Sequence, residues 1–494
     1  MDSLPHSASR AGRRLSAVAA VVALLGALPA LAHAASAGLA LNPDNPRYLT
    51  WNGKPIYLVG NGFYYSVSNA GFDYGRYFDE MARSGINYTR TWILLPIRQR
   101  GEDGSDDDWR WGRDAYPVRY VSPWERSGEG AAYDGEPRYR LDRFDPAYWK
   151  RLRGYLSYAR KRRIVVELTF FDDCYIRHGH WDDSPHWEYH PFNSINGGPI
   201  VADSHKEAAE FYNLENDEVR GCQEALVEKA LAETRGFENV IFEVCNEPYS
   251  RSIPWEWMQH WVDFIHARDD RLVSIEMARG AHPKADIRNM HLRWAGRVHR
   301  EFLEHVGDGK PLIADETPGY RGPRHDPEGA AAHRRAMWAA FVTGGHYNLL
   351  DYTWYRNPEY ADGGEAVRRW QGHLAEFVHR VVPWAMAPRD DLVVSAPAKA
   401  FALADPGKHY VVYLMGDTGP SEISVTLDAG RYRVQWFDPK TGEDGSRLTL
   451  NVPVGGAVTL ASPGFSEDMV LLIRRPLDRP TGKTQIKDWV PWRL

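Results

Sequence analysis

Residues 239–250 read NVIFEVCNEPYS and residues 310–320 read KPLIADETPGY. In both stretches a short apolar run ends at a carboxylate, Glu247 in the first and Glu316 in the second. Continuous apolar runs of this length are typical of strands that are buried on both faces of a parallel sheet. In a (β/α)8 barrel the C-terminal ends of all eight strands open onto one mouth, so the two glutamates are predicted to face each other there.

The rest of the first 388 residues supports a barrel. Strand and helix signals alternate from about Tyr48 to Val382, which predicts an α/β fold with parallel strands. Six further strands are expected at 54–63, 86–94, 163–171, 272–277, 287–294 and 344–355, the sixth in barrel order carrying His291 and the eighth Trp354. Only about ten residues connect the fifth strand to the sixth, so the helix between them is expected to be degenerate.

The C-terminal part has a different pattern. Short, often alternating apolar runs follow one another between Gly, Pro and Asp turns, which predicts an antiparallel β-sandwich over residues 389–476. The predicted domains are therefore a barrel over 40–388, the sandwich, and a tail over 477–494 without clear periodicity.

The N-terminus resembles an export signal. Arg10, Arg13 and Arg14 precede the apolar run LSAVAAVVALLGALPAL and the sequence Ala32-His33-Ala34, which together predict a signal peptide over residues 1–34. A membrane anchor is the alternative, but the run is short and contains Pro29. We expect an exported protein, periplasmic or secreted, with no membrane span after cleavage.

Composition excludes several classes of partner. The net charge is −6 and no long basic block follows the N-terminus, so nucleic acid is not an expected partner. No CxxC or HExxH pattern is present, and neither a metal nor a cofactor is expected. Of the three cysteines, Cys245 lies in a predicted strand, whereas a disulfide between Cys174 and Cys222 stays open.

Two glutamates at one barrel mouth can cleave a glycosidic bond. Glu247 would protonate the departing oxygen, which near neutral pH requires a raised pKa, and the Asn246 amide would bind a sugar hydroxyl. Glu316 would have to be ionised, and Arg90 could hold it so. Asp315 is the nearest rival as nucleophile, although strand alternation predicts that Asp315 and Glu316 point to opposite faces.

Aromatic residues near the expected mouth are candidate platforms for sugar rings. Each alone is more simply explained by packing, but as a set around one mouth some are expected to stack on substrate. They are Trp92, Trp181, Trp187, Phe63 and Tyr64.

The order of these motifs resembles glycoside hydrolase clan A, the retaining (β/α)8 enzymes. The resemblance rests on Asn87-x-x-Arg90, Asn246-Glu247-Pro248, His291, Glu316 and Trp354. Within that clan, the stretch PRYLTWNGKPIYLVGNGFYY resembles the opening of apiosidase-like hydrolases. The C-terminal stretches HYVVYLM, RYRVQWFDPKTGE and MVLLIRR resemble the module paired with those enzymes, often called collagen-binding.

The resemblance implies a role for each matching residue. Glu247 would be the acid/base and Glu316 the nucleophile, while Asn246 would bind the 2-hydroxyl group. Arg90 would orient Glu316, and Trp354 would form the floor of the −1 subsite. His291 is carried over as a further substrate-binding position.

We therefore expect a retaining glycoside hydrolase that acts on a poly- or oligosaccharide. Retention predicts carboxyl groups about 5–5.5 Å apart, against roughly 6.5–9.5 Å for inversion. The alternative is a carbohydrate-binding or adhesion protein that keeps the barrel without the reaction. Lyase or aldolase chemistry ranks last, because no strand end carries a Schiff-base lysine.

Overall fold

The computed structural model describes residues 38–94, 120–176, 187–201, 207–249, 253–277, 283–292, 294–316, 320, 322, 328–355 and 364–476. The predicted signal peptide, Trp181 and the predicted tail lie outside these residues. The described residues within the stretch Ala37–Leu494 belong to one compact unit.

The centre of the fold is a closed barrel of eight parallel strands, as the sequence predicts. Its strands follow the order β10-β11-β12-β13-β4-β5-β8-β9 around the barrel. Their bounds are β4 Val59–Gly62, β5 Tyr88–Trp92, β8 Val165–Asp172, β9 Val240–Asn246, β10 Val273–Glu276, β11 Ile287–His291, β12 Leu312–Glu316 and β13 His346–Leu350.

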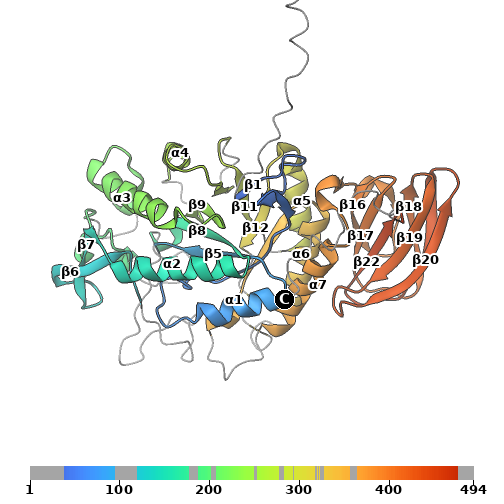
Figure 1. The fold of residues 1–494 in the computed structure, drawn as a ribbon, viewed down its shortest axis with the longest axis horizontal. Helices are drawn as coiled ribbons and strands as arrows, with labels where there is room; N and C mark the ends of the chain where they lie inside the picture. Colours follow the sequence, from blue (N-terminus) through green and yellow to red (C-terminus); the bar gives the residue numbers. More distant parts are fainter. Residues whose placement is uncertain are drawn as a thin grey trace, which may run out of the picture. The chain divides into compact units, whose positions relative to one another are not determined.

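Seven α-helices are described, and they flank the barrel strands (Figure 1). Helix α2 shows why they begin where they do: the Asp145 side chain accepts the Ala147 N–H, and Pro146 takes the first helical position, where no N–H is needed. Between β10 and β11 the described residues contain no helix, in agreement with the short connection. The helices are α1 Tyr74–Arg83, α2 Pro146–Lys161, α3 Asp217–Thr234, α4 Trp255–His266, α5 Ala295–His305, α6 Gly329–Val342 and α7 Glu365–Val378.

A small antiparallel sheet covers the N-terminal end of the barrel. It contains β1 Leu39–Leu41, β2 Leu49–Trp51 and β3 Lys54–Ile56, and Leu49 and Trp51 pack against the first residues of several barrel strands. The first predicted strand, 54–63, is therefore two strands, of which only β4 belongs to the barrel. The cause is the hairpin turn at Asn52-Gly53, where both residues have positive φ.

The segment 96–142, for which the sequence analysis predicts no strand, contains a hairpin in its described part. Strands β6 Trp124–Ala131 and β7 Pro137–Phe144 pair antiparallel. The hairpin contacts the long segment between β8 and β9, where the Asn196 side chain accepts the Tyr133 N–H at 2.9 Å. Both insertions follow C-terminal ends of barrel strands, which places them on the mouth side.

The C-terminal strands form the predicted sandwich of two antiparallel sheets. The larger contains β14 Ala387–Pro388, β16 Lys399–Asp405, β17 His409–Met415, β22 Asp468–Arg474, β19 Gly430–Phe437 and β20 Asp444–Val452. The smaller contains β15 Val393–Ser395, β18 Ser421–Leu427 and β21 Gly456–Ser462. Their facing apolar side chains form a separate core.

Helix α6 packs against the sandwich and forms part of the contact between the sandwich and the barrel. Its Arg334 side chain is fully buried and pairs with Asp468 at 2.8 Å and with Glu467 at 2.7 Å. Aromatic side chains from both parts, among them Trp338 and Tyr413, pack in one continuous cluster.

The structure answers two smaller questions. Cys222 is a free thiol, so the disulfide with Cys174 that the sequence left open is not formed in this structure. Among the described residues, no helix combines the length and the apolar character needed to cross a bilayer.

Candidate active site

Five consecutive strands of the barrel end in polar or ionisable residues. These are Asp172 on β8, Asn246 on β9, Glu276 on β10, His291 on β11 and Glu316 on β12. Because the strands are parallel and neighbours in the sheet, their C-terminal residues meet at one end of the barrel. Glu247 follows Asn246 directly and joins this group.

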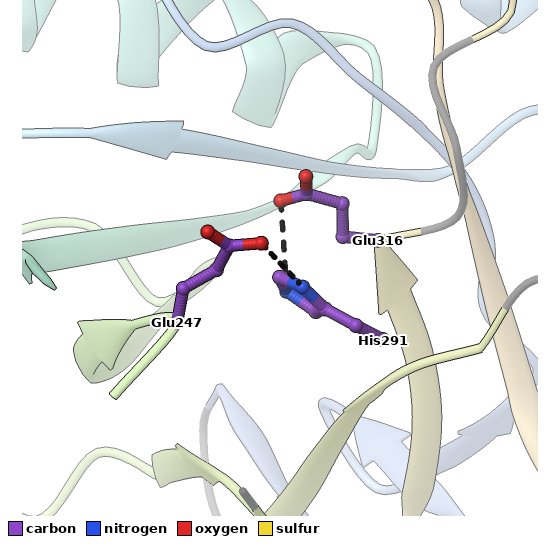
Figure 2. A group of neighbouring side chains, drawn as sticks. All are labelled: Glu247, His291 and Glu316. Carbon is purple, nitrogen blue, oxygen red and sulfur yellow. Dashed lines mark ion pairs between the residues drawn. The ribbon is translucent and has the colours of Figure 1, made fainter. Parts of the chain in front are cut away.

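Glu247 and Glu316 point toward each other from opposite sides of His291 (Figure 2). One oxygen of each carboxyl group and one ring nitrogen of His291 all lie within 4.8 Å of one another. His291 Nδ1 is 3.3 Å from Glu247 Oε1, and His291 Nε2 is 3.5 Å from Glu316 Oε2. The structure thus brings together the two glutamates that the sequence singled out.

His291 lies among four carboxyl groups. Glu276 and Asp315 lie 3.4 and 3.7 Å from Nε2, in addition to the two glutamates. Burial alone would lower the pKa of His291, but Glu276, Glu316 and Asp315 outweigh it and raise this pKa well above its usual value. The imidazole is therefore a cation that partly offsets the negative charge of the mouth.

Both oxygens of Glu316 are engaged. The Tyr64 hydroxyl donates to Oε1, and Arg90 Nη1 donates to Oε2 at 3.2 Å. Burial raises the pKa of Glu316, His291 opposes the rise, Glu247 adds to it, and Arg90 and Tyr64 oppose it. Tyr64, predicted as a sugar platform, is thus a direct partner of the candidate nucleophile.

Arg90 holds several groups at once. Its Nη2 donates to Asn246 Oδ1 at 2.8 Å, its Nε donates to Glu243 at 2.7 Å, and its Nη1 lies 3.2 Å from both Asp315 and Glu316. Arg90 therefore forms an ion pair with Asp315 and contacts Glu316 at the same time. A planar guanidinium with five donors can serve all these partners, which an ammonium group cannot do.

The expectation that Asp315 and Glu316 point to opposite faces is wrong. Between β11 and β12, Asn289 pairs with Ile313 but His291 pairs with Glu316, so β12 has one extra residue. Such a bulge interrupts the alternation of side chains. Both carboxylates consequently reach Arg90, with Asp315 fully buried and Glu316 partly open to solvent.

Below the mouth, a buried polar layer supports Arg90. Glu243 accepts from Thr169 at 2.5 Å, and Asn289 Nδ2 donates to Glu243 and Glu167 at 2.9 Å each. Burial and the neighbouring Glu243 raise the pKa of Glu167 to about 7. Glu243 thus binds Arg90 Nε on the inner side of the barrel, and Nη1 and Nη2 of Arg90 are left to donate to Glu316 and Asn246 at the mouth.

Two residues that the sequence analysis missed hold Glu247. Glu276 Oε2 accepts the backbone N–H of Glu247 at 2.7 Å, and Glu276 Oε1 accepts the Tyr249 hydroxyl. Burial raises the pKa of Glu276 to about 8, with His291 opposing and Asp315 and Glu247 adding to the rise. The position of Glu276 as the last residue of a buried strand was the available signal.

Asp172 is a further missed residue of the mouth. It pairs in register with Asn246 and accepts the Cys174 N–H at 2.8 Å. Burial and the nearby Glu247 raise its pKa well above the usual value, whereas a hydrogen bond with the Asn246 side chain lowers it. Asn246 is therefore oriented from two sides, by Arg90 and by Asp172.

The predicted aromatic platforms lie mostly in the core. Trp92 and Phe63 are each 1 % exposed; Trp92 packs under the Arg90 guanidinium at 4.5 Å, and Phe63 stacks on Phe72 at 4.4 Å. Trp187 is also buried and stacks on His190. All three rings are buried, whereas sugar stacking requires an exposed ring face.

Trp354 follows β13 in a 3₁₀ helix, Tyr352–Tyr355. Its indole N–H donates to Asn61 at 2.9 Å, and the Arg368 guanidinium lies 4.4 Å from its ring. The same 3₁₀ helix brings Tyr352 to 6.1 Å from the Tyr64 ring, which the sequence did not predict. The role of Trp354 as a subsite floor stays a prediction.

Glu247, His291 and Glu316 are also the described residues that could hold a metal ion. Tetrahedral zinc, with bonds of about 2.0–2.2 Å, brings its ligand atoms to roughly 3.4 Å of one another. The spacing here extends to 4.8 Å, so these side chains would have to draw together around an ion. The arrangement fits two facing acid groups better than a closed metal centre.

Comparisons with known proteins agree with this fold. Residues 97–278 match a family described as a domain of unknown function, DUF6298. A solved structure described as a glycoside hydrolase is 15 % identical, with a TM-score of 0.59 over 89 % of this chain and 97 % of that one. A glycoside hydrolase family 5 structure from Bacteroides vulgatus ATCC 8482 is 15 % identical, with a TM-score of 0.58 over 92 % and 98 %.

A search of curated proteins finds no match. Both structural neighbours are described as glycoside hydrolases. At this level of identity, the similarity establishes a shared fold, which is a (β/α)8 barrel followed by β-sheet.

Proposed function

We propose that this protein is an exported, retaining glycoside hydrolase that acts on a poly- or oligosaccharide. The observation that carries the proposal is the pair Glu247 and Glu316, with carboxyl oxygens within 4.8 Å across the barrel mouth. One oxygen of each carboxyl group lies within this distance of the other, which is compatible with carboxyl groups about 5–5.5 Å apart, the separation in retaining enzymes.

In the first step, Glu247 gives its proton to the departing sugar oxygen while Glu316 attacks the anomeric carbon. The bond from carbon to the leaving oxygen breaks, and an ester forms between the sugar and Glu316. Tyr64 and Arg90 hold both oxygens of Glu316, and each oxygen keeps a further lone pair for the attack. Asn246, oriented by Arg90, presents its amide to the sugar.

In the second step, Glu247 takes a proton from water, and the resulting hydroxide releases the sugar with net retention. The structure supports this change of role. Glu247 raises the pKa of Glu316 by repulsion between the two charges, and that repulsion is mutual. Ester formation removes the charge of Glu316, so Glu247 ionises more readily and is then free to accept a proton from water in the second step.

Two features of the N-terminal sequence make the proposal more specific: the stretch that resembles the start of apiosidase-like hydrolases, and the predicted signal peptide. They favour an exported enzyme and make apiosides reasonable members of a substrate panel. The C-terminal sandwich would accompany the barrel as an accessory module.

The test is a screen of aryl glycosides and a glycan library, with Glu316→Ala as the control. We expect turnover by the wild-type enzyme, loss of roughly 10⁴-fold or more in the variant, and covalent labelling of Glu316 by a 2-deoxy-2-fluoro glycoside. Product analysis by NMR should show retained configuration. Glycan binding without turnover would instead favour the non-catalytic alternative, and undiminished activity of Glu316→Ala would remove Glu316 from its role.

A further inference from the structure

Glu276 is engaged at both of its oxygens, yet no step of the proposed reaction uses it. It is the last residue of β10 and is only 3 % exposed. Oε2 accepts the Glu247 N–H at 2.7 Å, and Oε1 accepts the Tyr249 hydroxyl. A buried carboxyl group is costly to retain, so these two contacts call for a reason.

The turn that Glu276 holds is strained. Glu247 has φ of +47°, in the left-handed region, which costs a residue with a side chain roughly 1–2 kcal/mol. The Tyr249 N–H donates back to the Glu247 carbonyl at 2.5 Å, which closes the turn. Glu276 therefore grips both ends of the turn, one through the backbone and the other through a side chain.

The conformation of this turn decides where the Glu247 carboxyl lies. A relaxed φ would rotate the side chain away from Glu316 and His291. A displacement of about 1 Å in a reacting group can cost about 100-fold in rate. The Glu247 N–H would also lose its buried acceptor, so removing Glu276 releases the strain and the anchor together.

We propose that Glu276 is the positioning residue of the general acid, holding the Glu247–Tyr249 turn so that the Glu247 carboxyl faces the leaving-group oxygen. This inference rests on the proposed function and adds a residue on β10 to it. Glu276 acts through Glu247 and does not touch the substrate.

Leaving-group dependence separates positioning of the acid from general stability. A 2,4-dinitrophenyl glycoside needs little protonation of its leaving group, whereas the phenyl glycoside of the same sugar depends on the acid. Glu276→Ala should lose roughly 100-fold in kcat/KM on the phenyl glycoside and only a few-fold on the dinitrophenyl glycoside. The readout is kcat/KM because it reports the first step, whereas kcat also includes the second step, which both substrates share. Glu276→Gln, whose amide oxygen can still accept the Glu247 N–H, should recover most of this loss.

Two further variants complete the test. Tyr249→Phe removes the hydroxyl contact with Glu276 and should show a smaller loss with the same preference for the activated substrate. Asp468→Asn removes a buried carboxylate charge at the sandwich junction and should lower stability without any leaving-group preference. An equal loss of kcat/KM on both glycosides in Glu276→Ala, or no loss, would overturn the inference.

A crystal structure of Glu276→Ala gives a readout that does not depend on activity. We expect φ of Glu247 to leave the left-handed region; if it stays positive with the carboxyl unmoved, Glu276 does not position it. Inactivity of the wild-type enzyme on every glycoside would count against the proposed hydrolysis, and the crystal structure would still decide the role of Glu276.

Discussion

Replacing Arg90 by lysine tests the electrostatics of the mouth most directly. Arg90 lowers the pKa of Glu316, the group that must be ionised to attack. Lysine keeps the positive charge but, as a single point donor, cannot serve Glu243, Asn246, Asp315 and Glu316 together. We expect the ammonium group to stay with the deeper carboxylates and to withdraw from Glu316.

The size of the effect follows from the distance. At an effective dielectric constant of about 20, unit charges 3.2 Å apart interact by roughly 5 kcal/mol, and at about 5 Å by roughly 3 kcal/mol. The difference of about 2 kcal/mol corresponds to somewhat more than one pKa unit. Because the Glu316 pKa rises in the variant, the acidic limb of kcat/KM should move to higher pH by about one unit.

The assay is the pH dependence of kcat/KM, with folding checked by circular dichroism. Arg334→Lys is the matched control, since Arg334 is equally buried and pairs with Asp468 at 2.8 Å away from the mouth. It should lose stability without moving the acidic limb. A folded Arg90→Lys variant whose acidic limb stays within about 0.3 units of the wild-type position would refute the reasoning.

Two further predictions concern binding and stability. Trp294, three residues after His291 and 63 % exposed, is placed to stack on a sugar, so Trp294→Ala should raise KM for oligosaccharides roughly 2- to 10-fold and leave KM for aryl monoglycosides unchanged; an equal KM for both enzymes on oligosaccharides would contradict this. Glu276 has a pKa raised from 4.5 to about 8, so the stability it contributes is present below about pH 4.5 and is lost as the pH rises toward 8. Glu276→Gln should therefore gain unfolding free energy relative to the wild type between about pH 5 and 8, by up to about 1.4 kcal/mol per unit, as measured by urea denaturation; a constant difference across that range would argue against it.

The elements of the fold could be read from consecutive residues. The strands that carry Glu247 and Glu316 were predicted because an apolar run has a length and an end that are visible in the sequence. The same holds for the C-terminal strands, where β17 matches the run HYVVYLM at both ends. Such patterns involve neighbouring residues only. A strand buried on one face has alternating apolar residues, and a strand buried on both faces has a continuous apolar run.

Two parts of the fold differ from the prediction, namely the first predicted strand and the hairpin β6–β7. The apolar residues of 54–63 resembled one strand, whereas the Asn52-Gly53 turn pairs Lys54–Ile56 back onto β2. Strand β6 of the hairpin is mostly polar and exposed. Its sequence therefore lacks the alternation of apolar and polar residues by which a strand is predicted.

The contact between Arg90 and Glu316 was anticipated, but the other partners of the site residues were decided by the tertiary structure. The pairing of Asp315 and Glu316 with one arginine depends on a bulge between β11 and β12, which is a property of the register of two strands. Glu276 carries no motif, and it reaches Glu247 only because β9 and β10 are neighbours in the barrel. The hydrogen bond from Tyr64 to Glu316 joins residues 252 positions apart.

The sequence by itself therefore determined roughly where the barrel strands lie, and with the strands at β9 and β12 the two glutamates at the mouth. Only the folded barrel decided which donors hold each carboxylate, which rings are buried, and how the charges balance. The physical reason is that strand formation depends on the periodicity of neighbouring residues, whereas hydrogen bonds and pKa values depend on distances and burial that exist only after the barrel closes.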